Sequence, residues 1–79
     1  MIYCIIYSND KDDVRQLAGD FLEWKVPAKD LKEAIALAKK RLKQYGYNYC
    51  SIFKLDSDGV TVLATVEKSG KVEEEPGDV

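Results

Sequence analysis

Residues 30–46 read DLKEAIALAKKRLKQYG and carry the clearest structural signals in the chain. Asp30 stands three residues before Glu33, the spacing of a capping box, and Gly46 suits the left-handed residue that often ends a helix. These signals predict a helix from about Leu31 to Tyr45. At about 100° per residue, its apolar side chains form one stripe that is suited to packing on a sheet. The stripe contains Leu31, Ala34, Ile35, Ala38, Leu42 and Tyr45.

Two strand patterns precede this helix. Residues 2–7 are β-branched or aromatic apart from Cys4, which predicts a central strand. Residues 20–26 alternate between two sets of side chains, the period of a half-buried strand, and Pro27 ends the pattern. Between these strands, residues 14–19 fit either one helical turn or a hairpin loop, and we favour the loop.

Two further strand patterns follow the helix. Residues 48–55 and 60–67 predict a hairpin around the turn at residues 56–59. The order β-β-α-β-β predicts an α+β, two-layer fold: a four-stranded, mainly antiparallel sheet with one helix on one face. We therefore expect a single domain over residues 1–67. Residues 68–79 are rich in glutamate and predict a flexible acidic C-terminal tail.

The composition limits the classes of function. A chain of 79 residues supports one small core, which leaves little room for a deep catalytic cleft. It contains no histidine, so the commonest general base and the commonest metal ligand are both absent. We predict no catalytic residue, no metal site and no cofactor, and we do not expect an enzyme.

Location and redox state follow from similar observations. Neither a membrane span nor a signal peptide is recognisable, so we expect a cytoplasmic protein. Cys4 and Cys50 lack the spacing of zinc ligands or of redox motifs. Both are expected to be reduced core thiols, with a Cys4–Cys50 disulfide as the less favoured alternative.

Alternation along the strands predicts two faces of the sheet. The face expected to pack on the helix carries Ile2, Cys4, Ile6, Leu22, Trp24, Val26, Cys50, Ile52, Val60, Val62, Ala64 and Val66. The opposite face would expose Ile5, Leu55 and Leu63 together with the aromatic residues Tyr3, Tyr7, Phe21, Tyr49 and Phe53. That is more apolar surface than a monomer usually leaves in water, so the five aromatic residues are the predicted site for a protein partner or for self-association as a homodimer. Alternatively, the strand parity is reversed, the loop or the tail covers this face, or the aromatic rings stack on nucleic-acid bases.

A second candidate site lies on the predicted helix. Residues 29–45 contain six basic and two acidic residues, whereas the rest of the chain contains six basic and twelve acidic residues. The outer side of the helix carries the basic stripe Lys29, Lys32, Lys39, Lys40 and Lys43. This stripe could bind nucleic acid or an acidic partner, or it could be an ordinary solvated helix face.

Residues 30–67 also show a wider resemblance, carried by packing positions and a turn. These are Leu31, Ala34, Ile35, Ala38, Leu42, Gly46, Tyr47, Ile52, Asp56, Asp58, Gly59 and Val60. Their succession resembles that of small phage and mobile-element proteins with β-β-α-β-β order, including some anti-CRISPR inhibitors, and the helix is similar to that of HicB-like antitoxins. The resemblance implies an inhibitor or regulator that acts by binding a partner, and it assigns no functional residue.

Overall fold

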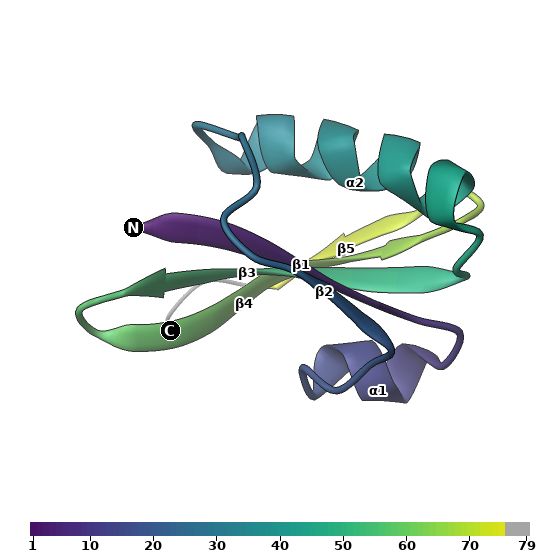
Figure 1. The fold of residues 1–79 in the computed structure, drawn as a ribbon, viewed down its shortest axis with the longest axis horizontal. Helices are drawn as coiled ribbons and strands as arrows, with labels where there is room; N and C mark the ends of the chain where they lie inside the picture. The colour runs from purple at the N-terminus through teal and green to yellow at the C-terminus, as the bar shows by residue number, and fades with distance from the viewer. Residues whose placement is uncertain (76–79) are drawn as a thin grey trace.

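The computed structural model describes residues 1–75, which form one five-stranded antiparallel sheet between two helices (Figure 1). The elements are β1 (Ile2–Ser8), α1 (Lys11–Arg15), β2 (Phe21–Glu23), α2 (Leu31–Tyr45), β3 (Tyr49–Asp56), β4 (Gly59–Glu67) and β5 (Val72–Glu74). The strand order is β2-β1-β3-β4-β5. The predicted α+β class is confirmed, with a fifth strand and a second helix that the prediction lacked.

Helix α2 has the predicted bounds and the predicted ends. The Asp30 side chain accepts a hydrogen bond from the Glu33 backbone N–H at 2.9 Å. The Glu33 carboxylate accepts from the backbone N–H of Lys29, one residue before the position that a standard capping box uses. Gly46 ends the helix with a φ of 79°, in the left-handed region that glycine adopts without strain. Local sequence therefore determines α2 at both ends.

The loop favoured for residues 14–19 is correct only from residue 16, because the short helix α1 spans Lys11–Arg15 and includes Val14 and Arg15. Asp10 caps α1 by accepting a hydrogen bond from the Asp12 backbone N–H. The one fully buried residue of α1 is Val14, which packs in a cluster with Cys4, Ile6 and Phe53. This helix covers the sheet face opposite α2 (Figure 1). The predicted bare apolar face is therefore covered.

The predicted parity of β1 is also wrong. Ile5 and Tyr7 pack in the cluster beneath α2, whereas Cys4 and Ile6 pack in the cluster beneath α1. Every residue from Cys4 to Ser8 is buried, so both faces of β1 lie in a core. A strand that is apolar on both sides carries no alternation that could determine which face meets which helix.

The hairpin of β3 and β4 follows the prediction more closely. Cys50, Ile52, Ala64 and Val66 pack beneath α2 as expected. A register shift after Ile52 pairs Ile52 with Ala64 and Phe53 with Val62, which leaves Leu63 as an extra residue on β4. Leu63 therefore packs beneath α2, contrary to its predicted position. Val60 was predicted in the core and is instead exposed near the hairpin tip.

Both cysteines are free and fully buried, as expected for reduced core thiols. Cys50 lies in the cluster beneath α2 and Cys4 in the cluster beneath α1, so the sheet separates them. Burial raises the pKa of the Cys50 thiol to about 12. The less favoured disulfide is not formed.

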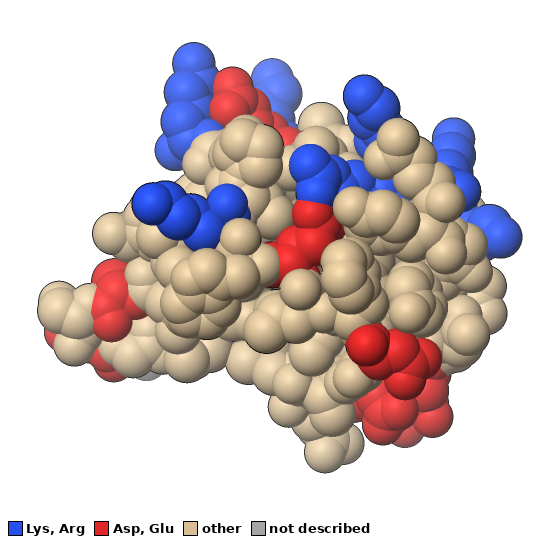
Figure 2. Space-filling model, viewed as in Figure 1, with Lys and Arg blue, Asp and Glu red and all other residues tan. Residues whose placement is uncertain are grey.

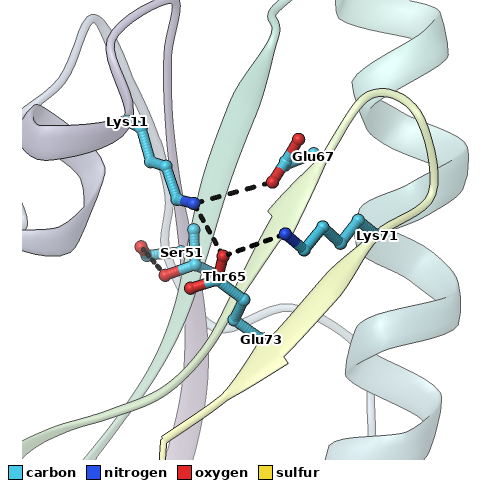
Figure 3. A network of polar contacts seen from close by, with 6 residues as sticks. All are labelled: Lys11, Ser51, Thr65, Glu67, Lys71 and Glu73. Atoms are coloured by element: carbon cyan, nitrogen blue, oxygen red, sulfur yellow. Dashed lines mark hydrogen bonds and ion pairs between the residues drawn. The ribbon is translucent and has the colours of Figure 1, made fainter.

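Strand β5 corrects the prediction of a flexible tail after residue 67. Residues 72–74 pair with β4, and Lys11 of α1 reaches across to bind Glu73 at 2.6 Å and Glu67 at 3.6 Å (Figure 3). The pair with Glu73 connects β5 to α1, and the pair with Glu67 connects the end of β4 to α1. The rest of the predicted tail, residues 76–79, lies outside the described residues.

Candidate functional site

Strand β2 lies at one edge of the sheet and is shorter than predicted. Only Phe21–Glu23 pair with β1, and no strand among residues 1–75 pairs with β2 on its other side. Lys25 has a φ of 57°, a left-handed conformation that interrupts the extended chain before it reaches Pro27. The predicted strand over residues 20–26 is therefore correct only in its middle.

The start of β2 depends on a close approach of two backbone segments. The backbone N–H of Asp20 donates to the carbonyl oxygen of Tyr7 at 2.8 Å. A Cβ atom on Gly19 would lie 2.6 Å from that same oxygen. Because no real Cβ contact is that short, the position requires glycine.

Aromatic rings pack where β2 meets the C-terminal end of α2. The ring of Tyr7 contacts those of Phe21, Tyr45 and Tyr47, with centroid distances of 5.7, 5.3 and 5.9 Å. Phe21 and Tyr45 also meet edge-to-face at 5.2 Å. Tyr7 is fully buried at the centre, whereas Phe21 and Tyr45 each expose 41% of their surface. The cluster therefore opens toward solvent at the sheet edge.

A polar group beneath this opening joins β2 to α2, and we call it the Glu23 clamp (Tyr7, Glu23 and Arg41). The Tyr7 hydroxyl donates to one carboxylate oxygen of Glu23 at 2.5 Å, and the Arg41 guanidinium pairs with the other. Burial is the main reason that the pKa of Tyr7 is raised well above its ordinary value. The hydroxyl therefore stays protonated and acts as a hydrogen-bond donor.

Large apolar side chains are exposed on and beside this edge, and we call them the β2-edge patch. Its members are Phe21, Leu22, Trp24 and Tyr45. Trp24, the one tryptophan of the chain, is 61% exposed, and Leu22 is 45% exposed. Figure 2 shows mainly uncharged atoms over the centre of this side of the molecule, where one acidic and one basic group meet. Single exposed apolar residues are ordinary, but four of them on and beside an edge strand and at the adjoining end of α2 make a candidate contact surface.

A shallow hollow adjoins the patch on α2. It has a volume of about 400 Å³ and is lined by Leu37, Lys40, Arg41, Gln44 and Tyr45. Tyr45 belongs to both the hollow and the patch. The hollow therefore adds polar and cationic side chains beside the aromatic surface.

The five predicted aromatic site residues do not share one exposed face. Tyr3 and Tyr7 pack in or against the cluster beneath α2, with Phe21 stacked on Tyr7, whereas Tyr49 and Phe53 lie with the cluster beneath α1. Of these five, only Phe21 is largely exposed. The predicted exposed aromatic face is wrong because α1 covers one side of the sheet and α2 covers the other.

Three residues of the β2-edge patch were predicted to lie in the core: Leu22, Trp24 and Tyr45. Leu22 and Trp24 were predicted to face the helix because they alternate with polar residues. The sequence contains one signal that Trp24 lies outside the core: Pro27 follows closely, and a strand that ends so soon leaves its last side chains at an edge.

The predicted basic stripe is exposed along the outer side of α2: Lys29, Lys32, Lys39, Lys40 and Lys43. Figure 2 shows basic groups above the sheet, where α2 lies, and acidic groups below it near α1. Lys29 pairs with Glu33 at 3.7 Å. Lys40 is the one member of the stripe that also lines the hollow beside the β2-edge patch.

Other kinds of site find no support in the described part of the chain. In residues 1–75, no group of three or more Cys, Asp or Glu side chains is placed to hold a metal ion. No helix within the same residues is long and apolar enough to cross a membrane. Comparison with protein-family models, curated proteins and solved structures finds no match to this chain. Function must therefore be argued from the residues themselves.

Proposed function

We propose that this chain is a non-enzymatic module that binds a protein partner through the β2-edge patch. The observation that carries the proposal is the exposure of Leu22 and Trp24 on and beside an edge strand whose outer side no strand of residues 1–75 occupies. Such an edge presents unpaired backbone groups, which can accept a strand from another chain.

The composition of the patch supports this proposal. Tryptophan, tyrosine, phenylalanine and arginine are enriched where protein interfaces gain most of their binding free energy. The Glu23 clamp fixes Arg41 and Tyr7 beneath the exposed rings, so the surface is ordered before any partner arrives. An ordered surface loses less conformational entropy on binding. The sequence resemblance suggests a specific version, an inhibitor encoded by a phage or mobile element.

Panning a random peptide library displayed on phage tests the proposal. Peptides selected on the wild-type protein are expected to lose binding to the double variant Leu22→Ser with Trp24→Ser. Val60→Ser is the matched control, because Val60 is also exposed but lies near the hairpin tip. Selected peptides that bind the double variant as tightly as the wild type would contradict the proposal.

Nucleic-acid binding by the basic stripe is the second candidate, and the exposure of its five lysines favours it. Phosphate contacts would make the affinity for an oligonucleotide fall steeply with salt. The double variant Lys39→Glu with Lys43→Glu would abolish this binding. An affinity that does not change with salt would exclude this candidate.

A further inference from the structure

The chemistry of the partner segment can be inferred from what surrounds β2, provided that the proposed function holds. An added strand would lie beside β2 with its side chains directed alternately to the two faces of the sheet. On the α2 face it would meet Phe21, Tyr45 and the hollow, because Tyr45 lines that hollow and contacts Phe21. On the α1 face it would meet Leu22, the neighbour of Phe21 on the strand.

The α2 face of this edge carries positive charge that residues 1–75 do not neutralise. Arg41 is already paired with Glu23. Lys40, which lines the hollow, has no acidic group within ion-pair distance among residues 1–75, and the same holds for the exposed Lys25. A carboxylate on the partner would complement Lys40 and could accept a hydrogen bond from the Gln44 amide.

The opposite face of the edge has a different character. Leu22 is an aliphatic side chain that is 45% exposed, so a partner gains free energy there by covering it with an apolar residue. The two faces together favour an added strand with a carboxylate on one side and an apolar residue on the other.

We propose that the β2-edge patch binds an extended acidic–apolar segment of a partner protein, in which acidic and apolar residues alternate. The segment adds a sixth strand beside β2. Its acidic residues face Lys40 and the hollow, and its apolar residues cover Leu22. Trp24, at the end of the strand, packs on whichever part of the segment passes β2.

A second copy of this chain fits the edge less well. Two β2 strands paired antiparallel about a twofold axis keep the same face of both sheets on the same side, so the two α2 helices become neighbours. Each would bring Lys40 toward the other, and like charges oppose that approach. Nucleic acid also fits less well, because it offers no backbone groups that match an unpaired strand.

The test uses the phage-displayed random peptides selected on the wild-type protein. We expect selected peptides to alternate acidic and apolar residues and to bind Lys40→Glu about tenfold more weakly. Lys39→Glu is the matched control: Lys39 is the neighbouring residue on α2, one step of about 100° away, and it does not line the hollow. A second selection on Lys40→Glu should favour basic residues in place of acidic ones.

The results separate the two proposals. Peptides that need Leu22 and Trp24 but bind Lys40→Glu as tightly as wild type would overturn the acidic segment and leave the proposed function standing. Peptides that are indifferent to all of these substitutions would overturn both. Thermal unfolding of each variant confirms that the exposed substitutions leave the fold intact.

Two further measurements have outcomes that would overturn the inference directly. A dimer seen by light scattering that becomes a monomer in the double variant Leu22→Ser with Trp24→Ser would assign the edge to a second copy. A single-stranded oligonucleotide that displaces the selected peptides and needs both Trp24 and Lys40 would assign it to nucleic acid. Either result would overturn the acidic–apolar segment.

Discussion

The two edges of the sheet are built in opposite ways. At the β5 edge the short strand Val72–Glu74 carries two glutamates, and Glu75 follows directly. At the β2 edge, Phe21–Glu23 expose a phenylalanine and a leucine, and Trp24 follows. Charged side chains on an edge oppose pairing with another chain, whereas exposed apolar ones favour it. On this comparison, charged side chains protect the β5 edge against strand pairing, and the β2 edge is the one that we propose binds a partner.

The edges also differ in how they are held to the rest of the fold. Strand β5 is joined to α1 by the ion pair of Lys11 with Glu73, which remains partly exposed (Figure 3). Strand β2 is held by the largely buried Glu23 clamp and by the close backbone approach at Gly19. Water and salt weaken exposed pairs far more than buried ones. Changes at the supports of β2 should therefore cost more stability than changes at the supports of β5.

The largest effect is expected for Gly19→Ala. The added methyl group would lie 2.6 Å from the Tyr7 carbonyl oxygen, so β2 must move away from β1. Overpacking of this kind costs about 1–3 kcal/mol, and we expect a loss near the upper end because the contact is with backbone. Chemical denaturation measures it, with the exposed neighbour Ala18→Ser as control. Unchanged stability in Gly19→Ala would contradict the close approach.

Tyr7→Phe should have the next largest effect. It removes the hydroxyl that donates to Glu23 but keeps the ring in the aromatic cluster. A hydrogen bond to a charged group contributes about 1.5–3 kcal/mol, so a loss of that size is expected in chemical denaturation. Tyr49→Phe is the control, since no hydrogen bond of the Tyr49 hydroxyl occurs within residues 1–75. Equal losses in both variants would argue against the Glu23 clamp.

Leu22→Lys places a charged side chain on β2, as the glutamates do on β5. Because Leu22 is largely exposed, the free energy of unfolding should change by less than about 0.5 kcal/mol. Binding of the selected peptides should nevertheless be lost, because the lysine cannot be covered by an apolar partner. Fluorescence polarisation of a labelled peptide measures this. Retained binding would show that the partner does not cover Leu22.

The smallest effect concerns pH at the β5 edge. Lys11 lowers the pKa of Glu73, first by its hydrogen bond and then by its charge. The ionised form is therefore favoured in the folded state, and its contribution is present above the ordinary glutamate value of 4.5. It is lost as the pH falls below 4.5 through the lowered pKa. Amide signals of β5 should change in that window, and they should not do so in Glu73→Gln.

Glu74→Gln is the control for this pH effect. Glu74 is exposed and forms no ion pair within the described residues. Its variant should keep the acid transition of β5. An acid transition that persists in Glu73→Gln would mean that Lys11 does not hold the edge through Glu73.

The parts of the fold that the sequence predicted are those with local causes. Helix α2 has a capping residue at Asp30, a C-terminal glycine at Gly46 and an apolar stripe between them. Each of these signals involves residues that are close in the sequence. The hairpin of β3 and β4 likewise follows from alternation and a glycine turn. These signals act over a few residues, so they can be read without knowing the tertiary structure.

The sequence-based predictions failed where contacts between distant segments determine the structure. Nothing local shows whether Ile5 or Ile6 meets α2, because both side chains are buried. The single helical turn of α1 gains its stability from Val14 inserting beside Cys4 and Phe53. Strand β5 pairs with β4 across a short turn in which Gly70 has a φ of 101°, and Lys11, far away in the chain, adds an ion pair with Glu73.

The sequence did not predict the β2-edge patch as a site, because contacts between distant segments also determine which side chains stay exposed. The sequence indicated correctly that aromatic residues are numerous, but the two helices cover most of them. Which rings stay exposed depends on which ones α1 and α2 cover, and contacts between segments far apart in the sequence decide that. Phe21 of the predicted aromatic site and Lys40 of the predicted basic stripe belong to the surface now proposed.

The most direct test of the difference between the two edges is an NMR map of binding. Amide spectra of the nitrogen-labelled protein are recorded with and without a peptide selected on the wild type. We expect the largest changes over residues 20–25 and on the C-terminal half of α2, with no change over residues 72–74. Changes confined to β5, or changes along the lysines of α2 with none over residues 20–25, would contradict the assignment of the binding surface to β2.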